Sequence, residues 1–298
     1  ALAMRPDDLP EVYNAWLRLG AGLPTSFLGE GSYGKFVDDK YDVGLNLKYH
    51  SGNFKGDDVE NQKFRKVDLG GNVTYYFDQG FAVGGDVKYS SNKFHYYAYN
   101  FDGSDTTGVK DADVQQKFNT IDIKAKIFNG VENVGDLNYS AGIDFYNHQD
   151  NFASKEDGLN LYLNATKWIA GAHSFDFNIS ADFTSYTDTI KQKLNNYYFQ
   201  PAFTYHGDIF KAKIGLNLVA NNDDFSFFPD IEAIVNLTGS ELAVFGGATG
   251  DLQKNTYRSL SDYNNYVSYR SPAMTIKNTK YFEYYGGIKG NVSKILES

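Results

Sequence analysis

The chain has no cysteine among its 298 residues, which excludes a disulfide framework and a thiolate metal site. It also lacks long apolar runs. Its mean hydropathy is -0.47, and no stretch approaches the roughly 18 consecutive apolar residues that a membrane-spanning helix requires. Any residence in a membrane must therefore be through β-strands.

Basic side chains are in the minority, with 28 Lys and Arg against 37 Asp and Glu, and the net charge is -9. A nucleic-acid surface needs clustered basic residues, so we expect no nucleic-acid partner. Residues 1–6 contain no charged region followed by an apolar core, so a signal peptide is expected to be removed or to lie outside this sequence. Proline is scarce at 6 residues, whereas 24 Tyr, 23 Phe and 29 Gly favour strands and tight turns.

Apolar and polar residues alternate with a period of two in runs of about ten residues. One run places Val43, Leu45 and Leu47 at one parity, and Asp42 and Lys48 at the other. Since successive side chains of a strand point to opposite faces, each run forms a strand with an apolar and a polar face. Sandwich strands average about five or six residues, and several runs here exceed about twelve. We therefore predict an all-β fold, an antiparallel up-and-down transmembrane β-barrel, in preference to a soluble sandwich.

The connections between the runs are alternately short and long. We predict about fourteen strands. The short connections are 78–80, 130–134, 170–172, 207 and 238–239, and the long polar ones are 54–63, 101–116, 149–157, 188–193 and 251–278. Short turns face the periplasm and long loops face the outside in transmembrane barrels. We therefore expect residues 1–298 to form one barrel domain of the outer membrane, with 251–278 as a long extracellular loop. The expected strands are 12–21, 25–35, 40–52, 64–77, 81–98, 117–129, 135–148, 158–169, 173–187, 194–206, 208–220, 225–237, 240–249 and 279–293.

The two parities predict two surfaces of this barrel. The apolar parity is expected to face lipid, and the polar parity carries both charge signs, as in a wet, ion-paired lumen without selectivity for one charge. Aromatic residues crowd the strand ends, as in the girdles at membrane boundaries. The residues expected to face lipid are Val43, Leu45, Leu47, Val73, Ile123, Ile143, Leu161, Ile179 and Leu216. Those expected to face the lumen are Asp42, Lys48, Asp68, Asp86, Lys88, Asp122, Lys124, Asp144, Asp182, Glu232 and Lys289.

The chain contains few candidates for chemistry. The stretch 102–105 places Asp102 and Asp105 at short spacing, but it lacks the closing Glu of a calcium loop, and a solvated loop is favoured. His148 and Asp144 share one face and are the least implausible catalytic pair, yet they belong to no known catalytic motif. We therefore expect no enzyme activity, no cofactor and no metal site.

A family resemblance rests on the last part of the chain. The aromatic and amide-rich residues Tyr257, Tyr263, Asn264, Asn265, Tyr266, Val267 and Tyr269, followed by the stretches 278–280 and 285–290, resemble barrel segments of TonB-dependent receptor-like outer-membrane proteins of the Bacteroidota type. The resemblance implies import of a scarce nutrient through the outer membrane. It also implies outer-membrane lipid as a partner, together with a TonB-type energy-transducing complex or a surface lipoprotein.

Two features depart from that family. A TonB-dependent receptor has an N-terminal plug and a barrel of about 22 strands, whereas strand-like sequence begins here by residue 12. Outer-membrane barrels also usually end on an aromatic residue, and residues 294–298 contain none. We therefore hypothesise a fragment of a larger barrel. The rival hypotheses are a complete fourteen-strand passive porin and a surface-binding or scaffold barrel without transport.

Overall fold

The computed structural model describes residues 13–56, 59–96, 114–131, 135–222, 224–237, 242–266, 275–293 and 296–297. These residues form one sheet of 15 strands in which every strand pairs antiparallel with its neighbours in the sequence. The strands are β1 (Ala15–Gly22), β2 (Ser26–Val37), β3 (Tyr41–Gly56), β4 (Val59–Tyr76), β5 (Phe81–His95), β6 (Gln115–Asn129), β7 (Leu137–Asp150), β8 (Lys155–Ile169), β9 (His173–Thr187), β10 (Lys191–His206), β11 (Phe210–Asn221), β12 (Asp224–Asn236), β13 (Leu242–Gln253), β14 (Thr279–Ser293) and β15 (Leu296–Glu297).

The prediction of an all-β, antiparallel up-and-down fold is confirmed, and a two-sheet sandwich is excluded by the single sheet. Most strands extend further toward the predicted long connections than the apolar alternation suggested, whereas β5, predicted to reach 98, ends at His95. The predicted connection 149–157 shrinks to four residues, because β7 continues to Asp150 and β8 begins at Lys155. Asp150, Glu156 and Asp157 therefore belong to strands and not to a loop. Their carboxylates accept hydrogen bonds from neighbouring residues, so polar sequence continues the sheet there.

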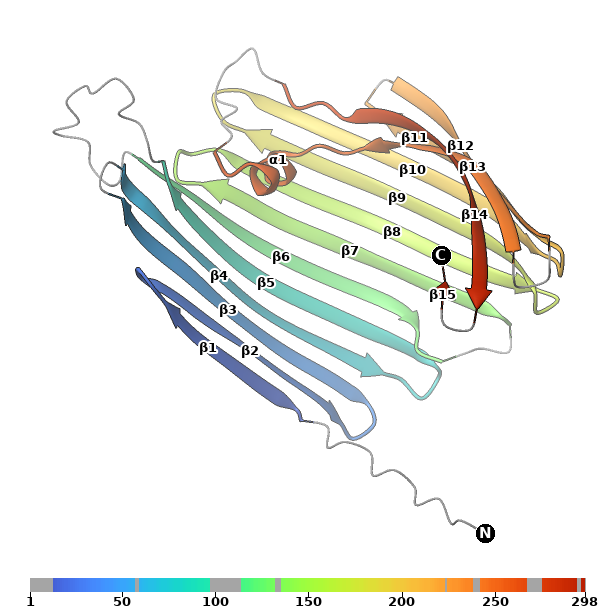
Figure 1. Cartoon of the computed structure of the whole chain (residues 1–298), viewed down its shortest axis with the longest axis horizontal. Helices are drawn as coiled ribbons and strands as arrows, with labels where there is room; N and C mark the ends of the chain where they lie inside the picture. The colour runs from blue at the N-terminus through green and yellow to red at the C-terminus, as the bar shows by residue number, and fades with distance from the viewer. Residues whose placement is uncertain are drawn as a thin grey trace, which may run out of the picture.

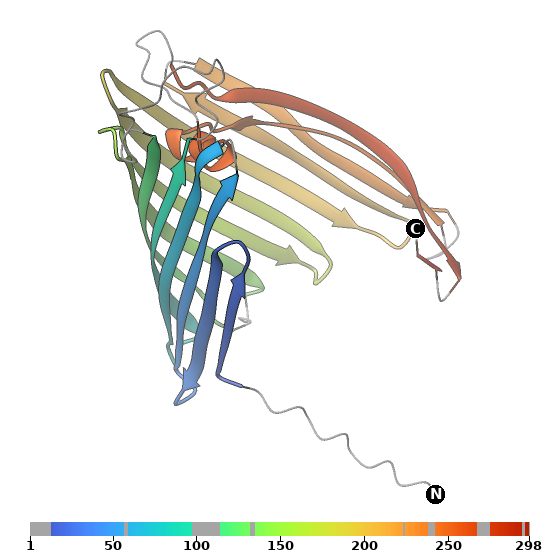
Figure 2. The same cartoon turned by 60° about the vertical axis from the view of Figure 1, so that its left-hand side comes forward.

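The sheet curves into an open trough (Figures 1 and 2). Its two margins, β1 at one side and β14 with the short β15 at the other, lie apart in both views. Within the described residues β1 pairs with β2 alone, and β14 pairs with β13 and β15. The pairing of 12–21 with 279–293 that a closed fourteen-strand channel requires is therefore not found in this part of the chain.

One helix interrupts the all-strand pattern, and the sequence did not predict it. The helix α1 (Tyr257–Tyr263) lies in the connection between β13 and β14 and folds back into the trough (Figure 2). We call the sheet surface that α1 covers the concave face and the opposite surface the convex face. The region that the structure describes contains no helix with the length and hydropathy of a membrane span.

Candidate functional site: a charged concave face and the α1 segment

A row of charges of alternating sign crosses the concave face. Strand register places Arg18 opposite Glu30, Glu30 opposite Lys48, and Lys48 opposite Asp68. The Glu30 carboxylate forms ion pairs with Arg18 and with Lys48, and the Lys48 ammonium lies 2.9 Å from a carboxylate oxygen. Opposite charges on directly paired residues stabilise neighbouring strands. The row therefore holds β1 to β4 in one register while keeping this face charged.

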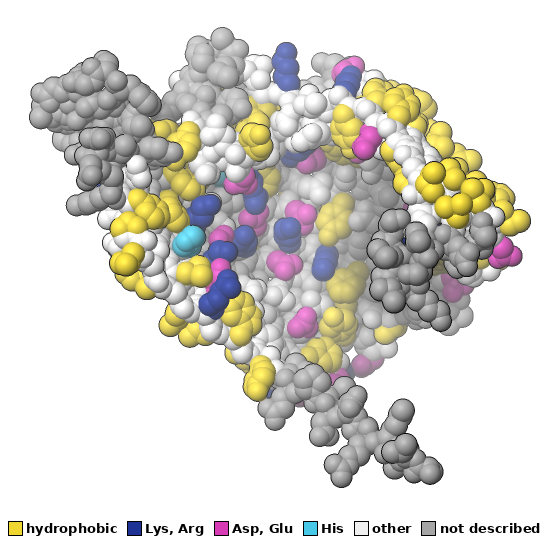
Figure 3. Space-filling view, in the orientation of Figure 1, with side chains coloured by type: hydrophobic (Ala, Val, Ile, Leu, Met, Phe, Trp, Pro, Cys, Tyr) yellow, Lys and Arg dark blue, Asp and Glu magenta, His cyan; other side chains and the backbone are white. Residues whose placement is uncertain are grey.

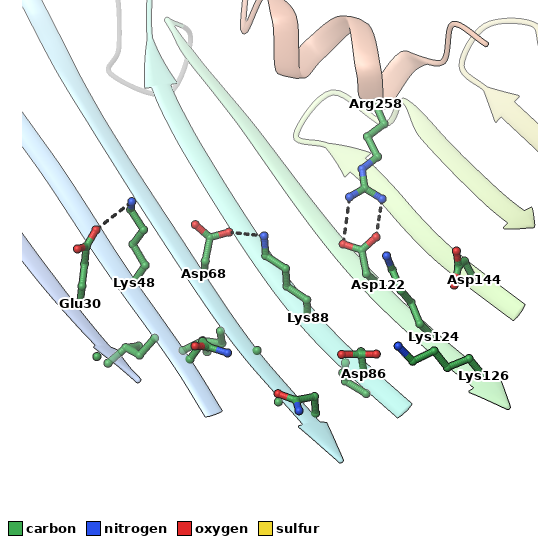
Figure 4. Close-up of a pocket in the computed structure, with 18 of the residues that line it drawn as sticks. Glu30, Lys48, Asp68, Asp86, Lys88, Asp122, Lys124, Lys126, Asp144 and Arg258 are labelled. Atoms are coloured by element: carbon green, nitrogen blue, oxygen red, sulfur yellow. Dashed lines mark hydrogen bonds and ion pairs between the residues drawn. The ribbon is translucent and has the colours of Figure 1, made fainter. Parts of the chain in front are cut away.

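The row continues on the next two strands. The Lys88 ammonium lies 3.4 Å from Asp68, and Lys88 is the register partner of Asp122. We call the six residues Arg18, Glu30, Lys48, Asp68, Lys88 and Asp122 the charge ladder. All of them except Arg18 line a groove of about 880 Å³, together with Asp86, Lys124, Lys126 and Asp144 (Figure 4). The hollow of the concave face shows acidic and basic side chains side by side (Figure 3). The groove can therefore hydrogen-bond a polar solute of either sign.

The helix α1 is held at its first turn by a buried carboxylate. Glu156 of β8 is 0% exposed, and its two oxygens accept hydrogen bonds from the backbone N–H groups of Tyr257 and Arg258, at 2.6 and 3.2 Å. The Tyr146 hydroxyl donates to the same carboxylate at 2.9 Å. Thr256 also caps the helix through Ser259. The first N–H groups of a helix have no partner within it, so these bonds fix the start of α1 on the sheet.

Arg258 connects α1 to the charge ladder. Its guanidinium donates to both oxygens of Asp122, at 2.5 and 3.1 Å, and lies 4.8 Å from the centre of the Tyr146 ring. The ring lies over Gly158, where an added Cβ would come within 2.0 Å of it. Gly158 therefore makes room for Tyr146, and Tyr146 supports the cation. Figure 4 shows the fork of Arg258 pointing down from α1 onto Asp122.

A buried histidine lies beneath the helix. The Nε2 atom of His148 is 3.1 Å from the Ser261 hydroxyl, and its Nδ1 atom is 2.8 Å from the Thr120 hydroxyl. Ser261 donates its own proton to the Arg258 carbonyl at 2.8 Å, so it accepts from His148, and the ring carries its proton on Nε2. A serine whose proton is already committed to a carbonyl is not an activated nucleophile. His148 contacts Thr120 and Ser261 and not Asp144, which lines the groove, so the structure does not bring the pair of His148 and Asp144 together.

The chain on both sides of α1 is also fixed to the concave face. Lys254 pairs with Asp182 of β9, and the Asn278 amide donates to Asn196 of β10 at 2.9 Å. Burial and the neighbouring Asp150 carboxylate raise the pKa of Tyr257, so its hydroxyl stays protonated and donates to Asp150 at 2.7 Å. An apolar cluster fills the space below the helix, and its members are Phe118, Tyr186, Leu194, Tyr257 and Ile276, with Leu260 against them. We call residues 254–266 the α1 segment. This part of the expected long connection 251–278 therefore lies against the concave face.

The structure places the predicted polar residues on the concave face, and it brings seven of them together. Lys48, Asp68, Asp86, Lys88, Asp122, Lys124 and Asp144 line the groove. Of the other four, Asp182 binds Lys254, and Glu232 accepts a hydrogen bond from Tyr285 at 2.8 Å. Asp42 and Lys289 lie on the same face by strand register, outside the groove.

The predicted apolar residues lie on the convex face. Leu45, Leu47, Val73, Ile123, Ile143, Leu161, Ile179 and Leu216 are 37–56% exposed, and Val43 is half-buried. An apolar surface of this extent is uncommon on a protein that faces water on both sides. We predicted lipid as the apolar partner of this surface.

Sequence reasoning missed four residues of the site. Arg18 and Glu30 lie in strands whose alternation is weak, and Arg258 and Ser261 lie in a connection that was expected to be a loop. The only local signal for α1 was a threonine followed three residues later by a serine. Asp102 and Asp105 lie outside the described residues. No group of three or more His, Asp or Glu side chains in the described part of the chain is arranged to hold a metal ion.

Comparisons with known proteins support the fold. No family model and no curated protein match the sequence. Among solved structures, the chain is similar to the FrpB iron transporter of Neisseria meningitidis, with a TM-score of 0.68 and 8% identity over 95% of this chain and 53% of that one. It is also similar to the ferric yersiniabactin uptake receptor FyuA of Yersinia pestis (TM-score 0.62, 11% identity, 94% and 52% covered) and to FpvA of Pseudomonas aeruginosa in complex with a pyoverdine (TM-score 0.59, 12% identity, 93% and 46% covered). The chain spans about half the length of these proteins.

Proposed function

We propose that the chain forms part of the wall of an outer-membrane barrel that takes up a solute in the manner of a TonB-dependent receptor. The observation that carries the proposal is the division of one up-and-down sheet into a charged concave face and an apolar convex face. In this account outer-membrane lipid covers the convex residues, and the concave residues line the lumen. The similarity to receptors and transporters of the same fold supports the proposal.

The open margins of the sheet favour a larger barrel. Strand edges in a bilayer leave backbone groups without partners, each at a cost of several kcal/mol, so a spanning sheet must be closed. We therefore propose that further strands, beyond those of β1 to β15, complete a wall of about 22 strands. A complete fourteen-strand porin would require β1 to pair with β14, and the described residues contain no such pair.

The cargo that we propose is a chelated ferric ion. The similar solved structures include an iron transporter and a ferric yersiniabactin receptor. The groove of about 880 Å³ carries both charge signs, so it can contact the polar groups of a chelate without retaining a free ion. The partner is then a TonB-type complex, which supplies energy for release. We also propose that the chain comes from a member of the Bacteroidota, and this rests only on the resemblance of residues 257–290 to receptors of that type.

Iron uptake by living cells tests the proposal. Cells that produce the protein and cells in which its gene is deleted are given a panel of ⁵⁵Fe chelates, with and without a protonophore. We expect at least one chelate to enter only when the gene is present and the membrane is energised. Passive entry of small sugars into liposomes that contain the purified protein, with no energised iron uptake by the cells, would contradict the proposal.

A matched pair of variants links uptake to the groove. Lys88 lies in the groove, whereas Lys193 is an exposed lysine of β10 whose strand parity places it on the convex face. We expect Lys88→Ala to raise the KM for uptake and Lys193→Ala to leave it unchanged. An equal effect of the two substitutions would show that the groove does not contact the cargo. If deletion of 253–277 abolished the capture of a surface partner without changing the flux of solute, the scaffold hypothesis would be favoured.

A further inference from the structure

Three basic side chains lie side by side on the convex face, on the strand halves that lead to the predicted long connections. Arg65 of β4 is the register partner of Lys93 of β5, and Lys93 is the register partner of Lys117 of β6. Directly paired residues have Cβ atoms about 5 Å apart, and like charges at that spacing destabilise a sheet. None of the three side chains forms an ion pair with another described residue.

The opposite face of the same strands shows how this chain treats charge elsewhere. There, Lys48 is paired with Asp68 and Lys88 with Asp122, so neighbouring charges alternate in sign. The convex row repeats one sign in a chain whose net charge is -9. Arg65 is exposed, and Lys93 and Lys117 are half-buried, so none of the three side chains is enclosed by the protein. An anion from outside the chain would relieve their repulsion.

Hydrogen-bond donors lie in the next row, one step nearer the middle of the strands. Ser91 and Asn119 are register partners there, and the Ser91 hydroxyl donates to the Asn119 Oδ1 atom at 3.0 Å. The Tyr89 hydroxyl donates to the same oxygen at 3.2 Å. With that oxygen occupied twice, Asn119 has only its amide N–H groups to offer to a ligand. The Asn119 amide therefore adds a hydrogen-bond donor for anionic oxygens beside the three cations.

An apolar groove of about 640 Å³ follows on the same strands, further from the basic row. Its walls include Leu45, Leu69, Val87 and Tyr89. Gly71 gives it depth, because an added Cβ there would lie 3.3 Å from the Leu45 side chain. At about 3.3 Å per residue, Val87 lies roughly 20 Å along β5 from Lys93. A ligand that fills both regions carries anionic groups at one end and an alkyl chain at the other.

The apolar part of β5 has the length of a membrane crossing. Its convex residues from Phe81 to Tyr89 form an apolar band over about nine residues of strand, and a tilted strand crosses a membrane in about 9–11 residues. Lys93 lies just beyond one end of this band, where headgroups are found. The predicted orientation makes this the outer leaflet, which in Gram-negative bacteria is built from phosphorylated glycolipid.

We propose that Arg65, Lys93 and Lys117 bind the phosphate groups of an outer-leaflet glycolipid, with one acyl chain in the groove beside Leu69 and Val87. This inference rests on the proposed outer-membrane location. The apolar groove favours a lipid over an acidic peptide, which would use the cations alone. The site is separate from the concave face and from the α1 segment.

Native mass spectrometry of the full-length protein in detergent tests the site. The probes are lipid A with two phosphates, the same lipid without phosphates, and inorganic phosphate as a competitor. The test variant combines Arg65→Ala, Lys93→Ala and Lys117→Ala. The control combines Lys48→Ala, Lys88→Ala and Lys124→Ala, which removes the same charge from the concave face.

We expect the test variant to bind phosphorylated lipid A about 100-fold more weakly, on the basis of about fivefold for each basic side chain near an anionic lipid. The control variant should bind as the wild type does, and millimolar phosphate should not displace the lipid. The proposal would be overturned if the protein bound lipid A equally with and without its phosphates, or if the test variant bound phosphorylated lipid A as tightly as the wild type does. Full displacement of the lipid by free phosphate would also overturn it. Fractionation of wild-type cells separates the two failures: a protein absent from the outer membrane refutes the proposed location, whereas a protein found there without phosphate-dependent binding refutes only the lipid site.

Discussion

Removal of the Arg258 side chain is expected to release α1 from the concave face. The guanidinium makes two hydrogen bonds to Asp122, at 2.5 and 3.1 Å, and lies 4.8 Å from the Tyr146 ring centre. Hydrogen bonds to charged groups contribute about 1.5–3 kcal/mol, and cation–π contacts about 0.5–2 kcal/mol. The side chains of Arg258 and Asp122 are 30% and 12% exposed, so solvent screens part of this energy. We therefore expect Arg258→Ala to weaken docking of α1 by about 2–4 kcal/mol, or about 30- to 700-fold.

Amide hydrogen exchange measures this release. The Leu260 and Asn264 N–H groups donate to the carbonyls of Thr256 and Leu260, at 3.0 and 2.9 Å, and exchange only when α1 opens. Their exchange should speed up by the factor given above in Arg258→Ala and by less in Arg258→Lys, which keeps the charge without the planar fork. Arg18→Ala removes a 64% exposed cation from the other end of the charge ladder and should leave these rates unchanged. Rates in Arg258→Ala within twofold of the wild type would refute the role of Arg258 as the anchor.

Three further outcomes are expected. Leu45→Arg on the convex face should cost about 2–4 kcal/mol of unfolding free energy in a bilayer, whereas Asn46→Arg on the concave face should cost far less; equal costs in a denaturant titration would reverse the assignment of the faces. Gly158→Ala should displace Tyr146 and lower the free energy of unfolding by about 1–3 kcal/mol. Gly34→Ala should not lower it, because an added Cβ there would lie 3.9 Å from the nearest atom, and the Tm values of the two variants check this. Because the pKa of Tyr257 is raised on docking, its contribution to the docking of α1 should be fully present below about pH 10 and be lost above it, so Tyr257→Phe should reduce the loss of docking in that range. A spin label at Tyr263→Cys, which is 93% exposed, reports the docking, and identical profiles of the two proteins above about pH 10 would count against the Asp150 contact.

The strands could be predicted because one physical rule governs them. In β9 the predicted and observed bounds agree at both ends, since apolar and polar residues alternate there from Phe175 to Phe183 without interruption. The same parity placed Leu45 and Lys48 on opposite faces. At the strand halves near α1 the rule weakens, because polar residues such as Asp150 and Glu156 are satisfied there by partners distant in the sequence.

The α1 segment could not be predicted for the same reason. A helix of 7 residues has too few turns to show a periodic apolar face, and this one is held by single residues on different strands. Arg258 finds Asp122, 136 positions away, and Ser261 finds His148, 113 positions away. Nothing local to residues 251–278 signals these contacts. The open margins of the sheet agree with the fragment of a larger barrel that the sequence led us to hypothesise, although they are a property of strand pairing and not of any one strand.

A pair of spin labels distinguishes a convex face that lies in lipid from a concave face that lines a wet lumen. The chain has no cysteine, so a single spin label can be attached at Ile123→Cys or at the adjacent Lys124→Cys in the full-length protein in outer-membrane vesicles. Ile123 is 46% exposed on the convex face, and Lys124 lines the concave groove. We expect the label at 123 to collide mainly with dissolved oxygen, which concentrates in lipid, and the label at 124 to collide mainly with a water-soluble nickel chelate. The same accessibility at both positions, or the reverse order, would contradict this expectation.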